Sequence, residues 1–182
     1  MILVFKEAGN QLENILASGR YNRAWDEYKD AITEAFHRHT GLKFKQSEIP
    51  VRVIEGNRSS STTQHGTMEL SAEVTEPEEI ATTLIHELAH HLLAGNGIDP
   101  PLTTQSAESE VPYLVHSYID LFIYDVIADV LGAEAASRYS EDELRMSSEY
   151  YGKAWQWAMA KTYEERQQTL SDLKKHYRVT SQ

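Results

Sequence analysis

A glutamate between two histidines at positions 86 and 90 constrains this chain more than any other feature. The segment reads His86-Glu-Leu-Ala-His90, which is an H-E-x-x-H motif. Each residue of an α-helix turns by about 100°, so His90 lies about 40° around from His86 and one turn along. Both imidazoles therefore reach the same point in space. Glu87 lies about 100° from His86 and about 60° from His90, which suits a base that works on a metal-bound water.

The residues around the motif predict the helix that this geometry requires. Thr75-Glu-Pro-Glu-Glu79 is a strong helix start, because Thr75 can cap the first turn and Pro77 is tolerated there. The helix is expected to run to about Ala94 and to stop at Gly95-Asn96-Gly97. The side opposite the histidines carries an apolar stripe that faces the core: Ile85, Leu88, Ala89 and Leu92.

Before the motif, hydrophobic periodicity predicts one helix and two strands. Residues 1–18 read as a short helix or an N-terminal arm, and 21–39 as an amphipathic helix. Residues 50–54 are strand formers, and 57–64 are polar and read as a flexible loop. Residues 66–74 alternate as a half-exposed strand. The apolar face of that strand comprises Met68, Leu70 and Ala72.

After the motif the pattern is helical. A long apolar helix is expected from about 106 or 109 to 131, with Pro112 in its first turns or at a kink. Residues 140–178 read as one or two amphipathic helices. We predict a single domain over residues 1–182, in which 140–182 form a C-terminal helical extension.

Charge and composition exclude several classes of function. The net charge of −11 disfavours nucleic acid and anionic lipid as partners. The chain has no cysteine, so disulfides and thiol catalysis are excluded, and a metal must be held by histidines and carboxylates. The apolar start is too short for a signal-peptide core, and no apolar run is long enough to span a membrane. We therefore expect a soluble, cytoplasmic protein.

The motif helix resembles the active-site helix of the zincin metallopeptidases. That resemblance covers roughly residues 20–131 and implies an α+β fold. A small, mostly antiparallel sheet is expected to pack on the helix, with further helices after it. It also implies that His86 and His90 bind one zinc ion per chain and that Glu87 is the general base. The strand at 66–74 stands where zincins pair an extended substrate with a sheet edge.

The third zinc ligand is implied only by a more detailed resemblance to one branch of the zincins. The metzincin branch needs glycine at 93 and histidine at 96, where this chain has Leu93 and Asn96. The segment 107–115 is instead similar to a signature of a gluzincin-like group. That group comprises the phage-repressor-cleaving and radiation-response regulators and the antirestriction-associated peptidases. Matching this signature assigns Glu108 as the third ligand. The alternatives are Glu110, His116 and the aspartates between 120 and 129.

The resemblance implies hydrolysis of peptide bonds in a protein or peptide substrate, by an endopeptidase rather than an exopeptidase. The zinc ion lowers the pKa of a bound water, and Glu87 accepts its proton. An oxyanion-stabilising side chain is expected among Tyr113, His116, Tyr118 and Tyr151. One alternative is a zinc-binding regulatory or protein-interaction module without peptidase activity. Another is a metal-free helical interaction protein.

Overall fold

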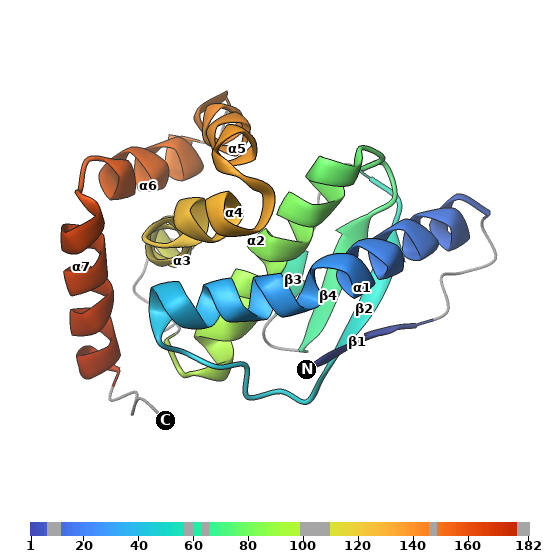
Figure 1. The fold of residues 1–182 in the computed structure, drawn as a ribbon, viewed down its shortest axis with the longest axis horizontal. Coiled ribbons are helices and arrows are strands. Elements are labelled where there is room, and N and C mark those ends of the chain that lie inside the picture. Colours follow the sequence, from blue (N-terminus) through green and yellow to red (C-terminus); the bar gives the residue numbers. More distant parts are fainter. Residues whose placement is uncertain (7–11, 57–59, 63–65, 99–109, 146–148, 178–182) are drawn as a thin grey trace.

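A computed structural model of the chain describes residues 1–6, 12–56, 60–62, 66–98, 110–145 and 149–177. In chain order the described elements are β1 (Ile2–Phe5), α1 (Leu12–Thr40), β2 (Glu48–Ile54), β3 (Ser60–Thr62), β4 (Thr67–Ser71), α2 (Pro77–Gly95), α3 (Glu110–Asp120), α4 (Ile123–Leu131), α5 (Ala133–Arg145), α6 (Glu149–Met159) and α7 (Tyr163–His176). The fold thus combines helices with a small sheet, as expected (Figure 1).

The sheet has the order β1-β2-β4-β3 and is mostly parallel. β1 pairs parallel to β2, and β2 pairs parallel to β4. Only β3 and β4 are antiparallel. The prediction of a mostly antiparallel sheet is therefore wrong. For β1 and β2 the physical reason is the crossover through α1, which carries the chain back so that both run in the same direction. For β2 and β4 it is β3, which lies between them in the sequence and runs antiparallel to β4.

Strand β4 confirms the predicted alternation over residues 67–70, but it ends at Ser71, which is buried although it was predicted on the exposed face. Its place in the sheet also differs from the prediction. Met68 and Leu70 are fully buried. Both edges of β4 are occupied, by β2 on one side and β3 on the other, so it cannot accept a further strand. The edge strands of the sheet are β1 and β3, and β3 lies in the stretch that was predicted to be a loop.

Helix α2 occupies the middle of the molecule, between the sheet and the later helices (Figure 1). It begins at Pro77 with Glu76 as its N-cap, so the predicted cap at Thr75 is wrong. Its predicted apolar stripe is completely buried, which confirms that this face packs in the core: Ile85, Leu88, Ala89 and Leu92.

The long helix predicted up to residue 131 is two helices, α3 and α4, that meet at residues 121–122. Every residue from Ile119 to Ile123 except Asp120 is fully buried, and Asp120 is 1% exposed. Five consecutive residues cover the whole circumference of a helix, so a straight helix cannot bury all of them on one face. The break lets α3 and α4 turn different faces inward. Among the described residues, no helix is long and apolar enough to cross a membrane.

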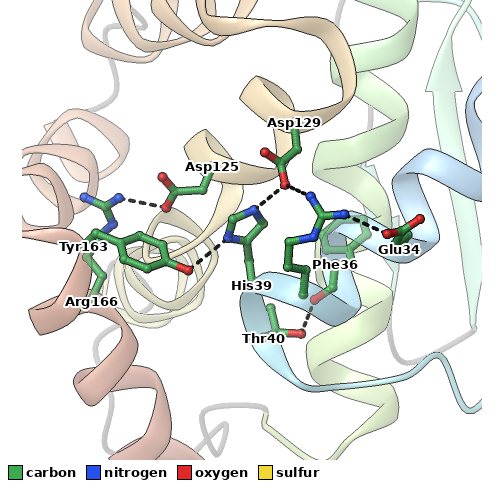
Figure 2. A network of polar contacts seen from close by, with 9 residues as sticks. Glu34, Phe36, His39, Thr40, Asp125, Asp129, Tyr163 and Arg166 are labelled. Atoms are coloured by element: carbon green, nitrogen blue, oxygen red, sulfur yellow. Dashed lines mark hydrogen bonds and ion pairs between the residues drawn. The ribbon is translucent and has the colours of Figure 1, made fainter.

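Helix α7 is joined to α1 and α4 by a network of polar contacts (Figure 2). Arg166 donates to Asp125 at 2.7 Å, and their side chains are only 10% and 18% exposed. Beside this pair, His39 Nε2 lies 2.8 Å from Asp129 and His39 Nδ1 lies 3.3 Å from the Tyr163 hydroxyl. The capping box of Thr162 and Glu165 fixes the start of α7.

The Asp125–Arg166 ion pair gives the first prediction. Asp125→Ala leaves the Arg166 guanidinium largely buried without its carboxylate, and we expect a loss of about 3 kcal/mol in the free energy of unfolding. Urea denaturation measures it. The control is Glu141→Ala, which removes an exposed ion pair with Arg145 and is expected to have little effect. Equal, small losses in the free energy of unfolding of both variants would show that water solvates the Arg166 guanidinium in place of the Asp125 carboxylate.

Candidate metal centre

The two motif histidines point to one place from the face of α2 opposite the core. Their Nε2 atoms are 3.3 Å apart and both side chains are half-buried. Two nitrogens that each lie about 2.05 Å from a tetrahedral zinc ion are about 3.3 Å apart. The separation of the two nitrogens therefore fits a shared metal ion.

A third histidine, His116 of α3, completes a cluster with His86 and His90. The centroid of its ring lies 5.1 Å from the ring centroids of both others. One ligand atom from each histidine lies within 4.8 Å of the other two, which is close enough to hold one metal ion. His116 is 7% exposed, and its buried Nδ1 has no hydrogen-bond partner among the described residues. Buried polar atoms normally have partners, so this cluster fits a bound ion.

Burial keeps all three imidazoles neutral. It lowers the pKa of His86 to about 4. It also lowers the pKa of His90 and His116 well below the ordinary value, and neighbouring histidines lower both further. A neutral imidazole has the free lone pair that a metal ion requires. All three rings are therefore neutral, and each has one nitrogen without a proton.

The proposed third ligands fall into three groups. Glu108 lies outside the described residues, and the side chain of Glu110 is likewise outside them. Asp125 and Asp129 face the α7 network, where they pair with Arg166 and His39 (Figure 2), and Asp120 is buried on α3 outside the histidine cluster. Among the described candidates, His116 is the one that the structure brings to the motif histidines.

Tyr139 of α5 contacts the cluster from the part of that helix that precedes the predicted helical region 140–178, a region that forms parts of three helices and not one or two. Its hydroxyl lies 2.7 Å from Nδ1 of His86 and also hydrogen-bonds the carboxylate of Glu143. Burial and the charge of Glu143 raise the pKa of Tyr139 well above its ordinary value. The i, i+4 spacing of Tyr139 and Glu143 was the available signal, but nothing in the local sequence connects these residues with position 86.

Three acidic side chains are buried at the centre. Glu87 is 4% exposed, Glu143 is 4% exposed and Asp120 is 1% exposed. Burial raises the pKa of Asp120 well above its ordinary value, and the charge of Glu143 raises it further. Burial also raises the pKa of Glu143, although its bond from Tyr139 opposes this.

The tyrosines predicted to stabilise an oxyanion are in different surroundings. The ring of Tyr151, on α6, stands edge-on to His116 with centroids 4.2 Å apart. Tyr118 instead contacts the ring of Tyr177. Of these two, Tyr151 is the tyrosine beside the cluster.

Comparison with protein-family models, with curated proteins and with solved structures finds no match to this chain.

The cluster predicts one divalent ion per chain. His90→Ala removes a ligand nitrogen, so we expect the variant to lose the ion that the wild-type protein takes up from zinc solution. Elemental mass spectrometry measures the bound ion. An ion present at 100 times its dissociation constant also stabilises the protein by about 2.7 kcal/mol, which EDTA should abolish. His37→Ala, at an exposed histidine of α1, is the control. Equal metal contents in both variants would contradict the site.

Proposed function

We propose that this chain is a zinc-dependent peptidase whose metal is held by His86, His90 and a third ligand. The observation that carries this proposal is the convergence of three neutral histidines beside the glutamate of an H-E-x-x-H helix. Histidine nitrogens suit zinc, and three protein ligands leave a fourth tetrahedral position open for water or substrate. When bound, zinc supplies Lewis acidity, which polarises a carbonyl and lowers the pKa of water.

Glu87 is the general base in this proposal. It follows His86 directly on α2, and its burial places the carboxylate where little bulk water competes for a proton. Its charge also raises the pKa of Tyr139, whose hydroxyl contacts His86, and this supports a role for Glu87 beside the same cluster. A carboxylate in this place accepts a proton from attacking water and returns it to the leaving amine.

His116 is the third ligand that the described residues favour, whereas Glu108 is the ligand that the zincin resemblance implies. The choice has chemical consequences. Three neutral histidines leave the full charge of the metal ion to act on water and substrate, while a glutamate neutralises part of it. Binding by both residues would fill the tetrahedral site. A filled site favours the alternative function, a zinc-binding regulatory or interaction module without peptidase activity.

The role of Glu87 gives a prediction that separates catalysis from metal binding. Glu87→Gln keeps the shape of the side chain but removes the base. We expect full zinc content and a rate of peptide cleavage lower by about 100-fold or more. The assay uses zinc-loaded protein and a library of fluorescence-quenched peptides. Glu79→Gln, at an exposed position near the start of the same helix, is expected to cleave at the wild-type rate. A wild-type protein that cleaves no library member would contradict the proposed activity.

The third ligand is identified by comparing His116→Ala with Glu108→Ala. We expect His116→Ala to lose the zinc and the activity, and Glu108→Ala to retain both. Zinc content and cleavage rate are measured on both proteins. The reverse result would assign Glu108. Loss of zinc in both variants would indicate a four-ligand site and favour the regulatory function.

A further inference from the structure

Helix α5 contacts the metal centre through one hydrogen bond, between Tyr139 and His86. The Tyr139 hydroxyl lies 2.7 Å from Nδ1 of His86, on the opposite side of the imidazole from the Nε2 that faces His90. Tyr139 thus contacts the ring nitrogen that is not available to a metal ion shared with His90. A hydrogen bond at this second nitrogen is what fixes the tautomer and the orientation of a metal-binding histidine.

When Glu143 is ionised, the donor and acceptor roles in both hydrogen bonds of Tyr139 are determined. A carboxylate can only accept, so the single hydroxyl proton of Tyr139 is donated to Glu143. The tyrosine oxygen is then left to accept from His86, which requires the His86 proton to be on Nδ1. Of the two buried acids nearby, Glu143 is the one that receives the hydrogen bond from Tyr139, and this bond favours the ionised form of Glu143. The charge of Glu143 in turn repels a charge on Asp120.

This arrangement also explains the contact between the two motif histidines. With its proton on Nδ1, His86 has a bare Nε2. In the absence of metal, that nitrogen can accept a hydrogen bond from His90 Nε2 at the observed 3.3 Å. The same bare Nε2 is the lone pair that a metal ion needs.

Packing against Trp155 fixes the position of the Tyr139 ring. Its ring stands edge-on to Trp155 of α6, with centroids 5.6 Å apart, and Trp155 is 1% exposed. Trp155 is held in turn by a hydrogen bond of 3.0 Å from its indole nitrogen to Ser140. The hydroxyl therefore points at His86 from a ring that is packed against the core.

We propose that Tyr139 and Glu143 are positioning residues that hold His86 with its Nε2 directed at the metal position. The effect on metal affinity rests on the proposed metal site, whereas the effect on the His86 tautomer does not. Neither residue contacts the metal position itself in this proposal. Both act through His86, so α5 is a part of the metal centre and not only a cover for it.

The test compares wild-type protein with Tyr139→Phe, which removes only the hydroxyl oxygen. In the zinc-free protein, nitrogen-15 NMR of the histidine side chains reports which nitrogen of His86 carries the proton. We expect Nδ1 in the wild type, and a shift of the proton toward Nε2 in Tyr139→Phe. With zinc, competition against a fluorescent chelator should show affinity weaker by about 10–100-fold. Glu143→Gln, whose amide oxygen still accepts from the hydroxyl, should weaken zinc binding less.

The matched control is Tyr124→Phe. Tyr124 of α4 also contacts the ring of Trp155, with centroids 6.5 Å apart, but no hydrogen bond or ring contact among the described residues joins it to His86. We expect its His86 tautomer and zinc affinity to equal those of the wild type. A wild-type His86 protonated on Nε2, or the same tautomer in Tyr139→Phe as in the wild type, would overturn the proposal. Both results are read without metal, so they are distinct from a failure of the wild-type protein to bind zinc or to cleave peptides.

Discussion

The burial of one face of α2 is the constraint on which the rest of the centre depends. Ile85, Leu88 and Leu92 are fully buried in the core, and this fixes the rotation of the helix. His86 and His90 are then obliged to converge on the opposite face. The same packed surroundings remove water from the histidines and keep them neutral. Core packing thus sets both the direction and the protonation state of the candidate ligands.

Local periodicity was sufficient to predict the elements that are decided locally. The alternation around Met68 and Leu70 predicted β4, and the apolar spacing around Leu88 predicted α2, because each element shows its buried face in its own sequence. The direction of the sheet is not decided locally. It depends on β1, which is only four residues long, and on the long crossover through α1. A strand so short carries almost no periodic signal, and this is why the parallel pairing was missed.

The same distinction separates the parts of the candidate site. His86 and His90 lie on one helix, so their spacing alone predicted that they converge. His116 was one of several alternatives, since its approach depends on how α3 packs against α2. Tyr139 and Glu143 were not predicted, because their helix meets His86 only through tertiary packing. The resemblance to zincins supplied Glu108 from a segment outside the described residues, so the fold neither supports nor opposes it.

The charge balance of the centre is a separate physical argument for a bound cation. The three histidines are neutral, so they bring no positive charge to the buried acids around them. Within the described part of the chain, no basic side chain is among the groups that shift the pKa of Asp120 or Glu143. Buried carboxyls without a cationic partner are costly and are held partly in their neutral form. A divalent ion held by His86, His90 and His116 would place positive charge one helical turn from Asp120. The same ion would be connected to Glu143 through His86 and the hydroxyl of Tyr139. The neutral histidines and the acids around them thus belong to one electrostatic arrangement, in which a bound cation would lower the cost of burying the carboxylates.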